Sequence, residues 1–326
     1  MRKILITLDY ELFFGKSGSL NKSIISPTNE LLKILDKFKV KASFFVDSGY
    51  ILKLNENMQT HHILKKEYDI ICQQIQRLHK DGHDILLHIH PHWEDTRFNG
   101  TNWVFNTSRY KLSDYSDQEI EDIIKRYIDI IFKITGDYPK VFRAGGWCIQ
   151  PFNKFAKYLK KYGVNIDSTI YFNGKNTTNT KSYDFTNMPN KLNWRFSSDP
   201  LFEDKDGDFL EIPITSVKLT PWFYFKFIYF KFFGGSAHKQ FGDGYPISNS
   251  KFQILSLLTK TSYSVASIDG YKSSLLNNIS RKNHQQLVLI GHPKSLSKYS
   301  LKKLDKFISN RINDSIFLTY SDYEEN

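Results

Sequence analysis

The chain has 326 residues, of which 40% are hydrophobic and 24% are charged, and it carries a formal net charge of +11 at pH 7. This length and apolar content agree with an enzyme-sized globular chain that can bury a large core, and length alone allows one large domain or two smaller ones. The charge does not predict binding to nucleic acid, because the Lys and Arg residues are scattered along the chain and no nucleic-acid motif accompanies them.

The N-terminal segment predicts a strand over residues 3–8 that ends in two carboxylates, Asp9 and Glu11. Carboxylates at this point are acceptable metal ligands, although an Asp at a strand end is often only a turn former or a helix cap. No apolar leader segment precedes the strand, so we expect a cytoplasmic protein.

Residues 82–93, GHDILLHIHPHW, contain four histidines after a short apolar run that predicts a strand. If the chain stays extended, His88, His90 and His92 share one face; if it turns helically, His88 and His92 meet and His90 points away. Both arrangements could hold a divalent ion, because neutral imidazole is the commonest metal ligand. The alternative is a histidine-rich surface loop without an ion.

Polar residues follow three further apolar runs in the same way. Arg143 follows residues 140–142, Asp167 follows the run that ends at residue 166, and His292 follows residues 287–290. Each could be purely structural, as an ion-pair partner, a turn residue or a cap. Because active sites of parallel α/β folds form at the carboxyl ends of the strands, their shared placement favours a functional site.

One segment, residues 221–233 (PWFYFKFIYFKFF), holds nine aromatic residues and two lysines. It is too short to span a bilayer, which takes about 20 apolar residues. We favour a buried strand or helix that packs on the domain and lines a substrate groove. Peripheral contact with a membrane interface is the alternative, and the basic net charge supports it.

Predicted helices alternate with the strands, which indicates a parallel α/β architecture. They cover residues 27–38, 67–80, 116–134, 151–162 and 300–312, and Ser116 with Glu119 predicts a capping box. We predict a single domain, residues 1–326, with loop insertions near 94–115 and 173–205. The pattern by itself does not separate a barrel from a doubly wound sheet.

The motifs at these strand ends resemble those of the polysaccharide deacetylase family, which shares the NodB homology domain. Thr7, Leu8, Asp9 and Tyr10 resemble the first motif, Thr-Phe-Asp-Asp, and Gly82 opens a segment similar to the second, in which two histidines stand four residues apart. The resemblance implies an incomplete (β/α)7 barrel and a bound divalent metal ion, most often zinc.

The resemblance also implies a role for each matching residue. Asp9 takes the place of the catalytic base, and His292 that of the general acid. Arg143 matches the arginine that orients the base, and Asp167 loosely matches the aspartate of the fourth motif. His88 and His92 match the two histidine ligands of the metal.

The chain departs from the family pattern at Tyr10, which replaces the second aspartate of the first motif, ordinarily a metal ligand. Glu11 is the nearest substitute, so we expect the metal-binding triad His88, His92 and Glu11. The tryptophan that often follows the fourth motif is also missing after Asp167.

These residue types predict a cytoplasmic, metal-dependent hydrolase that removes an acetyl or other acyl group from an amino sugar. The expected substrate is a lipid-linked or nucleotide-linked precursor of a surface polysaccharide or glycolipid, and no nucleic acid is expected as a partner. The first alternative is a deformylase or amidase that acts on another C–N amide. The second is a catalytically idle glycan-binding protein of the same fold.

Overall fold

The computed structural model describes residues 1–178, 180–247, 258–281 and 285–323. They form two compact units. The chain passes from unit 1 to unit 2 and returns to unit 1, and Tyr323 belongs to unit 2 again. Unit 1 comprises Met1–Ala42 and Ile214–Asp322, and unit 2 comprises Ser43–Pro213 and Tyr323–Asn326.

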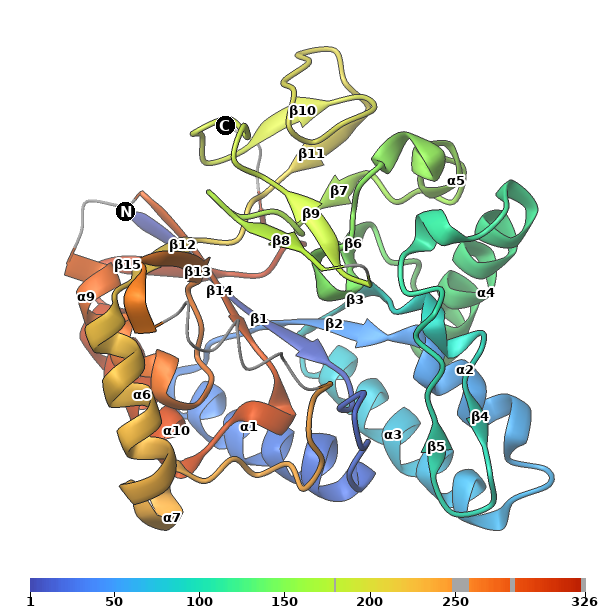
Figure 1. The fold of residues 1–326 in the computed structure, drawn as a ribbon, viewed down its shortest axis with the longest axis horizontal. Coiled ribbons are helices and arrows are strands. Elements are labelled where there is room, and N and C mark those ends of the chain that lie inside the picture. Colours follow the sequence, from blue (N-terminus) through green and yellow to red (C-terminus); the bar gives the residue numbers. More distant parts are fainter. Residues whose placement is uncertain (179, 248–257, 282–284, 324–326) are drawn as a thin grey trace. The chain divides into compact units, whose positions relative to one another are not determined.

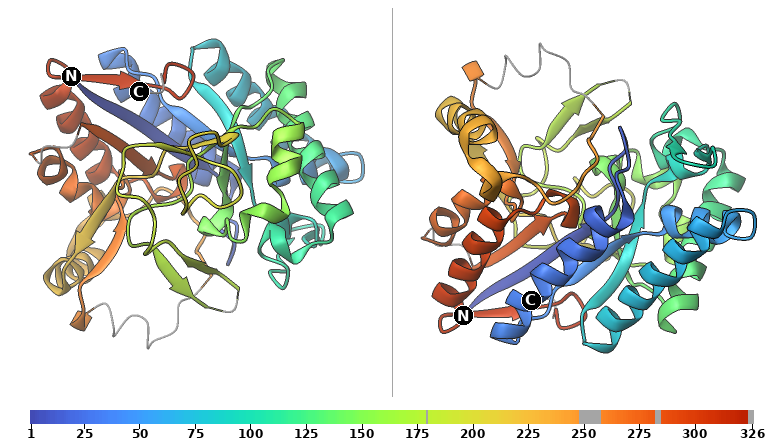
Figure 2. Two further views of the ribbon diagram at one scale, coloured as in Figure 1. Left: turned by 90° about the horizontal axis from the view of Figure 1, so that it is seen from above. Right: turned by 90° about the horizontal axis from the view of Figure 1, so that it is seen from below.

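Unit 1 is built on three parallel strands with β1 in the middle, paired with β14 on one side and with β15 on the other. The apolar residues of β1 and β14 are buried on both faces, as expected for strands of a covered parallel sheet. Helices α1 and α10 pack side by side (Figure 2). The elements of this unit are β1 (Arg2–Tyr10), η1 (Asn21–Ile25), α1 (Ser26–Phe38), β12 (Ser216–Leu219), α6 (Pro221–Phe233), α7 (Gly235–His238), β13 (Ser262–Val265), η6 (Gly270–Leu275), α9 (Leu276–Arg281), β14 (Gln286–Gly291), η7 (Pro293–Ser295), α10 (Lys298–Arg311) and β15 (Ser315–Leu318).

Unit 2 contains a sheet in the order β2, β3, β6, β7 and β11, all parallel, with β10 antiparallel at the end of this order. Two short hairpins, β4–β5 and β8–β9, lie in the predicted insertions (Figure 1). The elements are β2 (Ser43–Asp47), α2 (Ser48–Asn57), α3 (His62–Lys80), β3 (Asp84–Ile89), η2 (Pro91–Trp93), β4 (Arg97–Phe98), β5 (Trp103–Val104), η3 (Leu112–Asp114), α4 (Asp117–Thr135), β6 (Val141–Ala144), η4 (Gly145–Trp147), η5 (Phe152–Lys154), α5 (Ala156–Lys161), β7 (Ile166–Asp167), β8 (Lys175–Thr177), β9 (Ser182–Asp184), β10 (Trp194–Phe196) and β11 (Phe209–Glu211).

The predicted α/β class, with mostly parallel strands joined through helices, is confirmed and is consistent with the incomplete barrel of the NodB type. The capping box is also confirmed: the Ser116 hydroxyl accepts a hydrogen bond from the Glu119 backbone N–H, and the Glu119 carboxylate accepts one from the Ser116 N–H. The predicted helix over residues 151–162 is shorter and broken, because Phe155 adopts a non-helical conformation between η5 and α5.

The favoured interpretation of residues 221–233 as a buried element is wrong. The segment forms helix α6, and Phe223 is the one buried residue within it. Thr220 caps this helix by accepting a hydrogen bond from the Phe223 N–H, and Pro221 occupies its first turn, so the local sequence starts a helix as expected. In the described part of the chain, no helix has the length and apolar character that crossing a membrane requires.

Candidate active site

Two parallel strands of unit 1 bring a carboxylate and an imidazole together where they end. β1 and β14 pair with Leu8 opposite Gly291, so the residues that follow, Asp9 and His292, leave neighbouring strands at the same edge. Nε2 of His292 lies 3.7 Å from Oδ2 of Asp9, and both side chains are largely buried. The two groups face each other closely, and a carboxylate and an imidazole are side chains that can act as base and acid.

Asp269 fixes the orientation of His292. Its carboxylate accepts hydrogen bonds from the His292 backbone N–H at 2.8 Å and from the ring Nδ1 at 2.7 Å. Burial lowers the pKa of His292, but the carboxylates of Asp269, Asp9 and Glu11 outweigh this effect and raise the pKa above its ordinary value. The raised pKa favours the imidazolium form, in which Nε2 as well as Nδ1 carries a proton.

Glu11 reaches the same imidazole as Asp9. Its Oε1 lies 3.8 Å from Nε2 of His292, so the two carboxylates of Asp9 and Glu11 converge although Tyr10 separates them in sequence. The Glu11 carboxylate is also paired with Lys294, whose Nζ donates a hydrogen bond at 2.8 Å and a second one to the Leu12 carbonyl. Lys294 and Glu11 are both buried, so the pair is poorly screened by solvent.

In unit 2, strand β3 presents the first of the predicted metal ligands with one ring nitrogen already engaged. Nδ1 of His88 lies 2.9 Å from the backbone carbonyl oxygen of Arg143. A carbonyl only accepts, so Nδ1 carries the proton and Nε2 carries the lone pair. A histidine with this tautomer binds a metal ion through Nε2. The donor atom of His88 therefore fits the divalent ion that the resemblance to the polysaccharide deacetylase family implies.

The other two histidines follow where β3 gives way to the turn η2. His90 packs between its neighbours, with ring centroids 4.7 Å from His88 and 5.3 Å from His92. A ring nitrogen of His88 and one of His90 lie within 4.8 Å of each other. His92 is stacked on the ring of Tyr110 at 5.3 Å and 4°. The geometry therefore brings His90 beside His88, whereas His92 stays a candidate for the second histidine ligand through the resemblance to the family.

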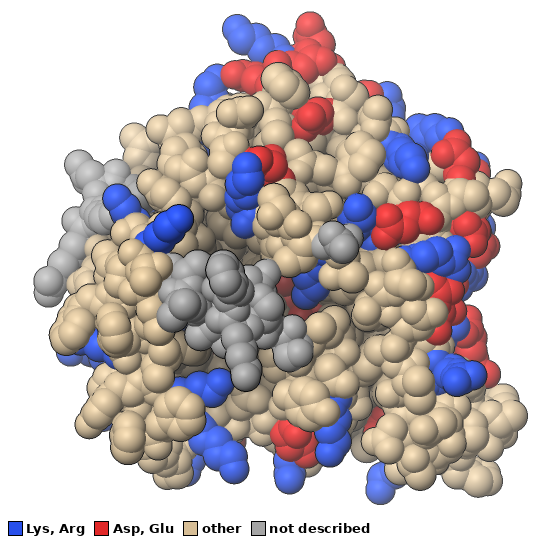
Figure 3. All heavy atoms as spheres, in the orientation of Figure 1, with Lys and Arg blue, Asp and Glu red and all other residues tan. Residues whose placement is uncertain are grey.

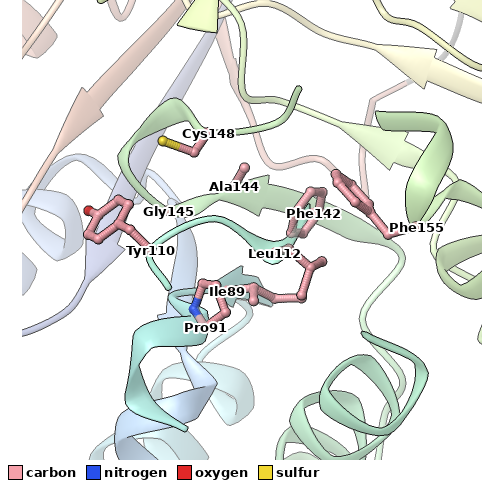
Figure 4. A pocket seen from close by; sticks show the side chains of 9 residues that line it. All are labelled: Ile89, Pro91, Tyr110, Leu112, Phe142, Ala144, Gly145, Cys148 and Phe155. Atoms are coloured by element: carbon pink, nitrogen blue, oxygen red, sulfur yellow. The ribbon is translucent and has the colours of Figure 1, made fainter. Parts of the chain in front are cut away.

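The glycines that follow β6 leave space for these rings. A Cβ atom at Gly145 would lie 2.5 Å from Nδ1 of His90, and one at Gly146 would lie 2.8 Å from the hydroxyl of Tyr110. A small pocket opens beside Gly145 and Tyr110, with room for about one water molecule (Figure 4). Cys148 lines this pocket, and burial raises the pKa of its thiol to about 11, so it is not a thiolate nucleophile at neutral pH.

Arg143 is held rigidly inside unit 2. Its Nε donates to the Ser168 carbonyl at 2.7 Å, one Nη donates to the Ser168 hydroxyl at 3.2 Å, and its guanidinium lies 3.8 Å from the centre of the Phe45 ring. The side chain is 1% exposed. Such an arginine is positioned by its surroundings and is suited to orienting another group.

Asp167 lies beside Arg143 and is also buried. It accepts hydrogen bonds from the Thr169 backbone N–H at 3.0 Å and from the Thr169 hydroxyl at 2.7 Å. Glu211 stands opposite Asp167 in the pairing of β7 with β11. Burial raises the pKa of both carboxyl groups, and the charge of Asp167 raises that of Glu211 further. Burial next to Asp167 therefore favours the protonated form of Glu211.

Three residues in these clusters were missed by the sequence analysis, namely Asp269, Lys294 and Glu211. Asp269 had a usable signal, because it follows residues 265–268, which are apolar except for Ser267, in the way that Asp9 and His292 follow their strands. Lys294 and Glu211 had none, since their roles depend on partners that are far away in sequence.

One protein-family model matches part of this chain. Residues 18–150 match the family model described as polysaccharide deacetylase, which confirms the resemblance predicted from the motifs. The matched region includes His88, His92 and Arg143, whereas Asp9, Asp167 and His292 lie outside it. The search of curated proteins finds no significant match.

Solved structures of similar fold include three proteins with low sequence identity. A protein assigned as a polysaccharide deacetylase from Mycobacterium smegmatis is 16% identical, with 98% of this chain and 87% of that chain covered and a TM-score of 0.49. A peptidoglycan N-acetylglucosamine deacetylase is 14% identical, with 99% and 89% covered and a TM-score of 0.44. A CE4 family pseudoenzyme from Bacillus anthracis is 12% identical, with 96% and 61% covered and a TM-score of 0.41.

Proposed function

We propose that this protein is a metal-dependent hydrolase that removes an N-acetyl or other acyl group from an amino sugar. The observation that carries the proposal is the cluster in unit 1, in which His292 is oriented by Asp269 and faces Asp9 at 3.7 Å. A carboxylate base next to a protonated imidazole acid is what hydrolysis of an amide requires, because water must lose a proton while the amine leaving group gains one.

Each residue has one role in the proposed reaction. Asp9 accepts a proton from the attacking water, and His292 donates its Nε2 proton to the nitrogen of the leaving amine. Asp269 holds the imidazole in the tautomer and orientation that this transfer needs. Arg143 keeps the Asp9 carboxylate ionised and oriented, as its counterpart does in the family, and Asp167 belongs to the buried cluster that fixes Arg143.

The proposed metal ligands are His88, His92 and Glu11, with His90 as the competitor of His92. A divalent ion held there, zinc in this proposal, would supply a Lewis acid for the scissile carbonyl and would lower the pKa of the attacking water. The tautomer of His88 supports this assignment. The pairing of Glu11 with Lys294 opposes it in part, because the ammonium group competes with a metal ion for the same carboxylate.

The proposed substrate is a lipid-linked or nucleotide-linked amino sugar, handled in the cytoplasm during assembly of a surface polysaccharide or glycolipid. A deformylase or amidase that acts on another amide with the same residues is the nearest alternative, and an idle glycan-binding protein is the alternative outside enzymology.

The first test is the metal content of the purified protein, measured by elemental analysis for the wild type and for His88→Ala and Glu11→Ala. A near-stoichiometric divalent ion in the wild type, lost in both variants, supports the assigned ligands. Loss in His88→Ala alone rejects Glu11. If the wild type takes up no ion even after reconstitution, the hydrolase proposal is overturned.

The second test separates an enzyme from a binding protein. Asp9→Asn should abolish acetate release from N-acetylated amino-sugar substrates and leave glycan affinity unchanged. Asp305→Asn is a matched control, because this carboxylate also lies in unit 1 but pairs with Lys37 on the surface. Equal activity of Asp9→Asn and the wild type would remove Asp9 from the reaction.

A further inference from the structure

Helix α6 presents a stripe of aromatic side chains to solvent. Trp222, Phe225, Tyr229, Phe232 and Phe233 are spaced by three, four, three and one residues, so they follow one side of the helix. All are exposed, from 53% at Phe225 to 74% at Phe233. A single exposed aromatic residue is ordinary in a soluble protein, but five on one helix face mark an interaction surface. We call these five residues the aromatic stripe.

The opposite side of α6 is fixed to unit 1. Phe223 is buried and its ring lies 5.4 Å from that of Tyr271, while the ring of Phe230 stacks on Tyr271 at 5.0 Å. The Tyr224 hydroxyl hydrogen-bonds to the Ser262 hydroxyl at 2.9 Å. The stripe is therefore held outward by packing of the inner face.

The charges around the stripe are positive. Lys226, Lys231 and Lys239 are exposed, and no Asp or Glu occurs between residues 212 and 242. The Lys226 ammonium lies 5.2 Å from the centre of the Trp222 ring, so a positive charge borders the stripe directly. On the face shown in Figure 3, the surface around α6 carries Lys and Arg side chains (blue) among uncharged residues (tan).

The charge of the whole chain is also concentrated in this unit. By sequence, unit 1 carries 23 Lys and Arg residues against 9 Asp and Glu, whereas unit 2 carries 22 against 25. The unit that bears the aromatic stripe therefore carries a net charge of +14, and the other unit carries −3. Such an asymmetry favours a partner with a negatively charged surface.

We propose that α6 is an interfacial helix, whose aromatic stripe inserts into the headgroup region of an anionic lipid membrane while the flanking lysines bind the lipid phosphates. Aromatic rings and lysines are the side chains that favour this region. The 13 residues of α6 extend about 20 Å, so the helix lies along the surface. Self-association through the same stripe is disfavoured, because it would bring two strongly basic units together.

The inference rests on the proposed function only where it concerns the substrate, because membrane docking would place unit 1 beside a lipid-linked amino sugar. Binding to lipid is measured without substrate. Binding to vesicles without release of acetate would support the interfacial helix and contradict the proposed function. Release of acetate without binding to vesicles would support the proposed function and contradict the interfacial helix.

The experiment is co-sedimentation of the full-length protein with vesicles of phosphatidylcholine alone or of phosphatidylcholine mixed with phosphatidylglycerol. We expect binding to the mixed vesicles, reduced by added salt, and little to the neutral ones. A triple variant, Trp222→Ala, Phe232→Ser and Phe233→Ser, should reduce the partition coefficient by at least about tenfold, because it removes three aromatic rings from the face that enters the membrane. Phe202→Ser is the matched control, because Phe202 is 68% exposed in unit 2 and should not affect binding.

A second variant, Lys226→Glu with Lys231→Glu, tests the charge separately from the aromatic rings, and it should abolish the preference for anionic vesicles. Activity on a soluble amino-sugar substrate should remain unchanged in both variants, which also shows that they fold. No binding of the wild type to either vesicle, or equal binding of the triple variant, overturns the inference. A wild-type dimer in sedimentation velocity that the triple variant abolishes, without vesicle binding, would identify a second copy of the chain as the partner instead.

Discussion

Replacing Lys294 by methionine tests whether Glu11 is a metal ligand. Nζ of Lys294 lies 2.8 Å from Oε1 of Glu11, and both side chains are 8% exposed. With an effective dielectric constant of about 20, the attraction between these charges is roughly 6 kcal/mol. A divalent ion bound to Glu11 would be repelled by the ammonium group. If metal binding to Glu11 costs a quarter of this attraction, the binding free energy becomes less favourable by roughly 1.4 kcal/mol, which raises Kd about tenfold.

Lys294→Met should therefore tighten binding of Zn²⁺ or Co²⁺ by about tenfold or more, measured by isothermal titration calorimetry of the metal-free protein at fixed pH. Lys33→Met is the control, because Lys33 pairs with Glu30 on the exposed surface of α1 and its removal should leave Kd unchanged. Circular dichroism checks that each variant is folded. If Lys294→Met binds no more tightly than the wild type while His88→Ala abolishes binding, the metal does not contact Glu11 and the reasoning is refuted.

Three further predictions concern stability and the histidine ligands. Ser116→Ala should lower the free energy of unfolding by about 1 kcal/mol, measured in urea, because it removes the cap of α4. Burial raises the pKa of Glu211, so the wild type should lose stability as the pH rises from about 4.5. Glu211→Gln should remove that loss, seen as a higher melting temperature than the wild type at pH 8 and a smaller difference at pH 5. Gly145→Ala should cost roughly 1–3 kcal/mol by overpacking and displace the His90 ring; an unchanged Co²⁺ affinity in the folded variant would exclude His90 as a ligand.

The strands that carry the candidate site were predictable because their apolar sequences indicate burial. Residues of β1 and β14 form continuous apolar runs, and such runs are typical of strands covered on both faces of a parallel sheet. The polar residues that end them, Asp9 and His292, then follow from the parallel register, which places both strand ends at one edge. Strand β2, with the sequence SFFVD, gave an equally apolar signal but was not singled out, and helix α2 after it was also missed.

What the sequence could not supply is the identity of partners that are distant along the chain. Asp269 orients His292 across 23 residues, and Lys294 neutralises Glu11 across 283 residues. Helix α6 illustrates a different failure. A helix that is apolar all round is normally buried, and its composition contains no information about whether the fold has room to cover it. In the structure Phe223 is covered and the aromatic stripe is not.

The spacing Asp-Tyr-Glu explains how the chain could dispense with the second aspartate of the family motif. Asp9 lies in β1 and Glu11 lies just beyond the end of this strand, and both carboxylates face His292 while Tyr10, which is 1% exposed, belongs to the core. Both carboxylates lie within 3.8 Å of Nε2 of His292, so the longer Glu11 side chain reaches the same imidazole as Asp9 although it stands two residues further along the chain. Two carboxylates this close repel each other, and Lys294 offsets that repulsion at the cost of competing with any metal ion for Glu11. The metal affinity of this protein should therefore depend on Lys294 as well as on the histidines.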